Sequence, residues 1–305
     1  MLVALGLLAC ASGGHPGALG WSLGGEAHVF IADDAFAREF YRELTGSGRL
    51  MGALEGRLLV AVEVRNARSA TVLSANGAAP ARVTLARFHA PQTCGYAGVV
   101  TELILAFPPG GAAGRSTPPS HVTVVALLDA PPFAGGAGSA RPALSAADAR
   151  ALVRDVADRA EIATRGAPLG LLHPPTLDAD RAADAGEVVA LGPRYGVGFR
   201  ATFVSGSAAD TTLITGVAAT DLELRNLHWV VGPQRTRLTR GMIPRTSTAR
   251  RYSVRGTVSG PGGGTLLLLD EIADVSARDS RAMVLDPTSG RIIAAQPLAL
   301  RCPSP

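Results

Sequence analysis

YGVGFRATFVS, at residues 195–205, is a clear β-strand pattern in the second half of the chain. It follows the turn residues Gly192 and Pro193, and it is short and rich in β-branched and aromatic side chains, as strands are. Similar short runs recur, separated by Gly, Pro and Asp, at 187–191, 211–219, 222–231, 251–258, 265–272, 281–285 and 291–295. The spacing predicts a C-terminal antiparallel β-rich domain over 187–305, either a sandwich or a barrel.

The first part of the chain mixes two hydrophobic periods, so we expect an α+β domain over 25–130. Strands are predicted at 27–32, 58–64, 82–88, 98–107 and 121–129. A helix is predicted after Asp33 or Asp34, with an apolar face at Phe36, Phe40, Tyr41 and Leu44. The dipeptide Asn76-Gly77 is typical of a hairpin turn.

The segment 131–186 is predicted to be a linker followed by a helical connector. Residues 131–143 are rich in Pro, Gly and Ala, and Ser145 is a suitable N-cap with Asp148 three residues later. The helix that follows has an apolar face at Leu152, Val153 and Val156, and a second short helix is expected at 178–185. The predicted fold class is therefore α+β, with an N-terminal α+β domain, a helical connector and a C-terminal β-rich domain.

The N-terminal segment ends in Leu7-Leu8-Ala9-Cys10 after a short apolar run. This pattern resembles a bacterial lipoprotein signal, in which the cysteine becomes lipidated. The run is too short for a membrane span, which needs about 20 residues, and no basic residue precedes it, which a start codon assigned too late would explain. We expect residues 1–24 to be signal and Gly-rich tether, and the protein to be exported and anchored in the cell envelope through Cys10.

Composition excludes several chemistries. All 29 basic residues are arginine, so the chain has no P-loop lysine, Schiff-base lysine or Ser-x-x-Lys nucleophile. Neither a His-Glu-x-x-His nor a Gly-x-Ser-x-Gly motif occurs. We predict no cofactor and no metal, and the low aromatic content of 5% gives little support for nucleic-acid binding.

Cys94 and Cys302 remain once Cys10 is assigned to the anchor. An even pair in an exported protein suggests a disulfide between them. His89 lies near Cys94 in sequence, and with His121 and Asp129 it offers an alternative: a thiol or metal site, or a hydrolase centre assembled from dispersed residues.

The segment from Leu224 to Leu269 contains no acidic residue but has eight arginines, of which Arg225 is the first. The other seven are candidate anion-binding residues: Arg235, Arg237, Arg240, Arg245, Arg250, Arg251 and Arg255. Anionic lipid, acidic polysaccharide or an acidic protein are suitable partners. The alternative is that strand alternation sends neighbouring arginines to opposite faces.

These observations together predict a non-catalytic binding or structural protein that contacts the membrane through its lipid anchor. The alternative function is an envelope hydrolase that uses His89, His121 and Asp129.

Overall fold

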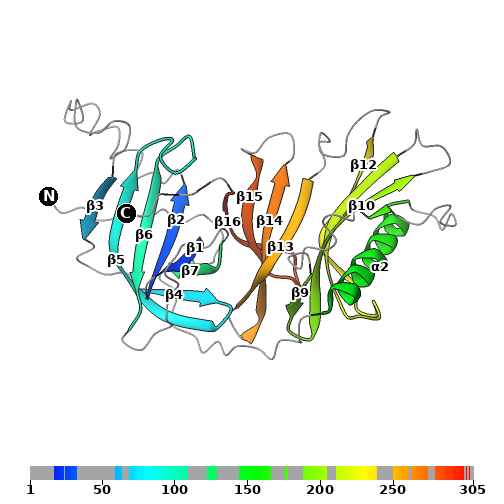
Figure 1. Cartoon of the computed structure of the whole chain (residues 1–305). Helices are drawn as coiled ribbons and strands as arrows, with labels where there is room; N and C mark the ends of the chain where they lie inside the picture. Colours follow the sequence, from blue (N-terminus) through cyan, green and yellow to red (C-terminus); the bar gives the residue numbers. More distant parts are fainter. Residues whose placement is uncertain are drawn as a thin grey trace. The chain divides into compact units, whose positions relative to one another are not determined.

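The computed structural model describes a chain made mainly of antiparallel strands (Figure 1). The described residues are 17–23, 25–32, 59–63, 69–108, 122–128, 144–165, 176–177, 188–204, 211–238, 250–260, 263–273, 279–298, 300 and 302. The chain divides into two compact units: unit 1 contains residues 1–136, 260–262 and 294–305, and unit 2 contains residues 137–259 and 263–293. The sequence places a boundary near residue 130 and assigns the C-terminal tail to the β-rich domain, although the predicted pairing of Cys94 with Cys302 ties that tail to the first unit.

Unit 1 is built on a closed β-barrel. Its strands are β1 (Gly17–Leu23), β2 (Glu26–Ala32), β4 (Ser69–Ser74), β5 (Gly77–His89), β6 (Val100–Ala106) and β7 (Val124–Leu128), with β3 (Leu59–Glu63) added on β5. The order around the ring is β5-β4-β7-β1-β2-β6, and pairing of β5 with β6 closes it. Closure leaves these six strands without a free edge.

The barrel interior is filled by small and medium apolar side chains. On β6, Leu103 and Leu105 point inward, and Ala27 and Val29 of β2 and Ala86 and Phe88 of β5 meet them. Because successive side chains of a strand point to opposite faces, Glu102 and Val100 of β6 face the outside of the barrel. That outer face carries the site described below.

Strand β1 corrects the prediction of a flexible tether. Ala18 and Leu19 are 3% and 1% exposed, and β1 pairs with both β2 and β7. Gly20 is required by close approach, since a Cβ there would lie 1.8 Å from the carbonyl oxygen of His28. Gly20, one of the glycines that suggest a tether, therefore allows β1 to pack tightly against β2.

Unit 2 contains two sheets and one described helix. The first sheet has the order β12-β11-β10-β8, with β9 also paired to β10. The second has the order β13-β14-β15-β16, in which β16 crosses the division and continues into unit 1 from Ala294. The strands are β8 (Thr176–Leu177), β9 (Val188–Leu191), β10 (Arg194–Val204), β11 (Thr211–Thr220), β12 (His228–Leu238), β13 (Arg250–Ser259), β14 (Thr265–Ala273), β15 (Arg281–Leu285) and β16 (Ile292–Pro297).

The first sheet of unit 2 is covered on both faces. One face packs against helix α2 (Ala146–Arg165) (Figure 1). Val156 and Ala160 of the helix share a buried cluster with Phe199 and Ile214 of the sheet. The opposite face packs on the second sheet through residues such as Val217, Leu267 and Met283. The layers are therefore helix, sheet and sheet.

The predicted α+β class with a helical connector is wrong. The described residues are mostly strand and contain one helix, and that helix is a packed layer of unit 2 because its apolar face is buried on β10 and β11. The helices predicted near residue 36 and at 178–185 lie outside the described residues. The start of α2 is confirmed: Ser145 Oγ accepts a hydrogen bond from the backbone N–H of Asp148 at 3.1 Å.

The predicted strand at 222–231 is shifted in the structure. Residues 222–226 form turns and a bend, and β12 starts at His228. The cause is Asp221, whose carboxylate accepts hydrogen bonds from the backbone N–H of Arg225 and the side chain of Asn226. These side-chain hydrogen bonds within the turn compete with the backbone hydrogen bonds that would extend the strand.

No described helix combines the length and the apolar composition needed to cross a membrane.

Replacing Gly20 with alanine tests the role of β1 in the barrel. The added methyl group overlaps the backbone of β2, so Gly20→Ala should destabilise the protein by about 2 kcal/mol or more, as overpacking does. Gly232→Ala is the matched control, because nothing lies within 4 Å of a Cβ there, and it should change stability by less than about 1 kcal/mol. Urea unfolding measures both, and equal effects would show that β1 is not tightly packed.

Candidate functional site

Glu102 is a carboxylate held on the outer face of the barrel. In the strand register it lies between Phe30 of β2 and Arg87 of β5. His28 and His89 occupy diagonal positions on the same two strands, two residues from Phe30 and from Arg87. Long side chains at diagonal positions are within reach of one another on one face of a sheet, so three strands bring these groups together.

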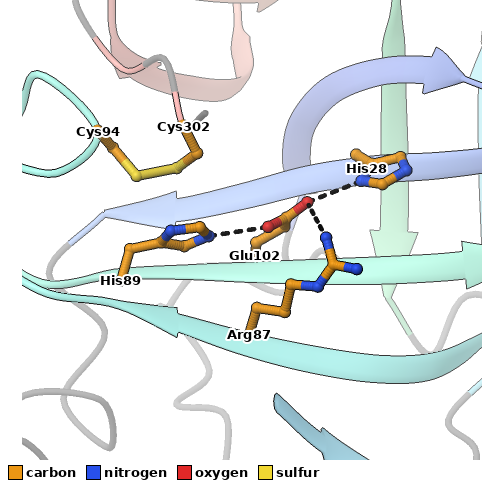
Figure 2. The surroundings of a disulfide bond; sticks show 6 residues. All are labelled: His28, Arg87, His89, Cys94, Glu102 and Cys302. Carbon is orange, nitrogen blue, oxygen red and sulfur yellow. Dashed lines mark hydrogen bonds and ion pairs between the residues drawn. A yellow bond between two sulfur atoms is a disulfide. The ribbon is translucent and has the colours of Figure 1, made fainter. Parts of the chain in front are cut away.

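Both oxygens of Glu102 are engaged (Figure 2). His28 Nδ1 lies 2.7 Å from Oε1, and His89 Nε2 lies 2.8 Å from Oε2. Arg87 Nη1 adds an ion pair with Oε1 at 3.6 Å. The other nitrogen of His28 faces Glu26 at 3.9 Å. Glu102 is 3% exposed and His89 is 2% exposed, so the contacts are shielded from water.

The electrostatics of the cluster favour an ionised Glu102. Burial raises the pKa of this carboxyl, but the hydrogen bonds and positive charges of His28 and His89 outweigh burial and lower the pKa from 4.5 to about 2. An ionised carboxylate only accepts hydrogen bonds. Both histidine nitrogens that face it are therefore donors.

A disulfide between Cys94 and Cys302 lies next to this cluster (Figure 2). Cys94 is on the turn that joins β5 to β6, where Gln92 and Gly95 both have φ of 70° and Gln92 N–H donates to the carbonyl of Tyr96. The two half-cystines pack with Phe30, Val100 and Leu300. This is the pair that the cysteine count suggests, and it joins the C-terminal tail to the barrel.

His89 connects the carboxylate to the sulfurs. One ring nitrogen of His89 and the two sulfurs lie within 4.8 Å of one another, and all three residues are buried. The sequence pairs His89 with Cys94 as a candidate site, and the structure does bring them together. The other members of that candidate, His121 and Asp129, lie outside the described residues, as does Cys10.

Sequence reasoning misses Glu102, His28 and Arg87. One signal is present: Glu102 is a single acidic residue inside the apolar strand VTELILA of β6. A carboxylate in such a run is buried on one face or the other and needs a partner. Arg87 lies 15 residues from Glu102 along the chain, and His28 lies 74 residues from it. These partners cannot be assigned without the strand register.

The arginines of the arginine-rich segment have different surroundings in the structure. Arg250 lies 3.1 Å from Glu271, and Arg255 lies 2.7 Å from Asp270. Both acids follow directly after the acid-free stretch and are brought alongside by pairing of β13 with β14. Arg235 and Arg237 are exposed on β12, while Arg251 is half-buried on β13. Arg240 and Arg245 lie outside the described residues.

Glu271 is the centre of this second network. Its carboxylate forms ion pairs with Arg250 and Arg281. It also accepts a hydrogen bond from the hydroxyl of Tyr252 at 3.2 Å. Gln234 in turn donates to that hydroxyl at 3.2 Å. Burial and the negative charge of Glu271 raise the pKa of Tyr252 to about 12. The network joins β12, β13, β14 and β15 within unit 2.

A pocket of about 540 Å³ also lies on unit 1. Its described lining comes from β4, β5 and the end of β6: Ser69, Ala70, Pro80, Ala81, Arg82, Thr84, Ala106, Phe107 and Pro108. None of these residues is a histidine, a cysteine or an acid. The titratable cluster and the pocket are therefore different places on the barrel.

Comparison with known protein families, with characterised proteins and with solved structures yields no match for this chain.

The pH dependence of stability tests the Glu102 cluster. Because folding lowers the pKa of Glu102 from 4.5 to about 2, its contribution is complete above pH 4.5 and is lost as the pH falls towards 2. The advantage of the wild type over Glu102→Gln should shrink by about 3 kcal/mol between pH 5 and pH 2.

Urea unfolding at several pH values measures this advantage. Glu26→Gln is the matched control, since Glu26 faces the same histidine at 3.9 Å but is half exposed, and its profile should follow that of the wild type. Parallel profiles for Glu102→Gln and the wild type would contradict the assignment.

Proposed function

We propose that this protein is exported and lipid-anchored in a bacterial envelope, and that its role is binding or structural and not catalytic. The observation that carries the proposal is the disulfide between Cys94 and Cys302, which are 208 residues apart. Disulfides persist in oxidising compartments and are rare in the cytosol. The anchor itself rests on Leu7-Leu8-Ala9-Cys10.

The chemistry of the described cluster supports a non-catalytic role. Glu102 has both oxygens engaged and is nearly inaccessible to solvent. The sulfurs beside His89 are oxidised, so they offer no nucleophile in this state. The alternative is a hydrolase that uses His89 with His121 and Asp129, the last two of which lie outside the described residues.

A binding role for the arginine-rich segment is best supported at Arg235 and Arg237. They lie two residues apart on β12, so they project from the same face, and both are exposed. Arg250 and Arg255 are engaged by Glu271 and Asp270, so we assign them a structural role. The proposed partner is an anionic surface, such as lipid, acidic polysaccharide or an acidic protein.

Cell fractionation tests the anchor. Expressed behind a complete signal that retains Leu7–Cys10, the wild type should sediment with membranes, because two or more acyl chains anchor stably. Cys10→Ser should move the protein to the soluble fraction, whereas the control Ala11→Ser should stay with membranes. Unchanged membrane association of Cys10→Ser would remove the lipoprotein assignment.

Vesicle co-sedimentation tests the arginines with a soluble Cys10→Ser chain. At low salt it should bind vesicles containing anionic lipid and not neutral ones, and salt should weaken binding since the Debye length is only about 8 Å at physiological ionic strength. Each basic residue near such a surface contributes about 1 kcal/mol, so Arg235→Glu with Arg237→Glu should reduce binding at least tenfold.

The control for the vesicle test is Arg82→Glu with Arg150→Glu. This variant has the same change in net charge at two exposed arginines outside the segment. If both double variants lose binding equally, net charge and not the β12 surface is responsible. If the wild type does not bind anionic vesicles, anionic lipid is excluded as the partner, and acidic polysaccharide becomes the next probe.

A further inference from the structure

We propose that Cys94, Cys302 and His89 form a binding site for a zinc-type divalent cation when the disulfide is reduced. The sulfurs and a nitrogen of His89 already lie within 4.8 Å of one another. In tetrahedral zinc sites, with Zn–S of about 2.3 Å and Zn–N of about 2.0–2.1 Å, neighbouring ligand atoms are roughly 3.5 Å apart. Shifts of roughly 1–2 Å therefore convert the cluster into a coordination site.

Glu102 prepares His89 for this role. The carboxylate engages Nε2 at 2.8 Å, so Nε2 carries a hydrogen and Nδ1 is left as the coordinating nitrogen. Histidines that bind metals usually donate their other ring N–H to a carboxylate, which fixes the tautomer and the ring orientation. Arg87 and His28 contact Glu102 on the side away from His89 and take no part in coordination (Figure 2).

The reaction is balanced with a dithiol as the reductant. Two electrons and two protons pass from the dithiol to the disulfide, which gives two cysteine thiols and an oxidised dithiol. The cation then displaces both thiol protons, together with any proton on Nδ1. Two thiolates neutralise a divalent charge, so the buried complex adds no net charge to the interior.

The ligand set selects the class of metal. Thiolate and imidazole suit zinc and similar ions, whereas magnesium and calcium prefer oxygen ligands. Three protein ligands leave the fourth position for water or another small ligand. The disulfide and the metal complex exclude each other because both use the same sulfurs, so the redox state decides which of them forms.

The test uses the full chain, reduced with a dithiol, desalted without oxygen and titrated with Co²⁺ as a spectroscopic probe. We expect one equivalent per chain, with a thiolate-to-metal charge-transfer band that Zn²⁺ abolishes. The oxidised chain should show no band. Bound metal should raise the thermal midpoint of the reduced chain by several degrees, since it binds the folded state.

Two histidines that contact the same carboxylate provide the matched variants. His89→Gln should weaken metal binding by more than 100-fold, whereas His28→Gln should change it less than threefold. Glu102→Gln should weaken it by about 10–100-fold, as loss of an outer-shell partner does. Circular dichroism of each reduced variant reports whether it is folded, and cobalt spectra in urea report any binding by the unfolded chain.

Several outcomes would overturn the proposal. One is the absence of the charge-transfer band in reduced wild type, whether or not the reduced chain stays folded. Another is a band of equal strength in urea, since unfolded cysteines would then be responsible. Equal affinities of folded His89→Gln and His28→Gln would exclude His89 as a ligand. A reduced chain that refolds when metal is added would support the proposal.

Discussion

The pairing of β5 with β6 is the constraint on which unit 1 depends. It closes the barrel, and its register places Arg87 opposite Glu102. A shift of one residue would turn Glu102 into the apolar interior, where a carboxylate without partners is very costly. The position occupied instead lets a buried negative charge meet two histidines and an arginine. The register of this strand pair thus affects the packing of the core and places Arg87 and His89 of the cluster, while the pairing of β2 with β6 places His28.

The sequence predicts individual strands well but not their partners. Local alternation and turn residues place most strands of unit 2 within a few residues, because those signals come from neighbouring side chains. The role of Gly20 depends on the distant carbonyl of His28, so glycine-rich composition is misread as a tether. Likewise, the amphipathic pattern of α2 predicts its helix but not the sheet that covers it.

The arginine-rich segment shows a related difficulty. Counting charges along the chain suggests eight uncompensated arginines, yet Asp270 and Glu271 lie immediately beyond the stretch counted. Because β14 pairs antiparallel with β13, Asp270 lies beside Arg255 and Glu271 lies beside Arg250. Charge balance in a sheet is set across strands, so a window along the sequence overestimates the positive surface. For the Glu102 cluster, the carboxylate in an apolar strand could be noticed, but its histidine partners could not be assigned.

Strand β12 forms one end of its sheet among the described strands, and this position has a consequence for solubility. An open edge offers backbone groups to any other extended chain. Pro233 has no backbone N–H to donate, the pairing with β11 is irregular near Val217, and Arg235 and Arg237 add positive charge. A second copy of the same strand would meet like charges and an interrupted ladder. The edge is therefore protected against the self-association that leads to fibres.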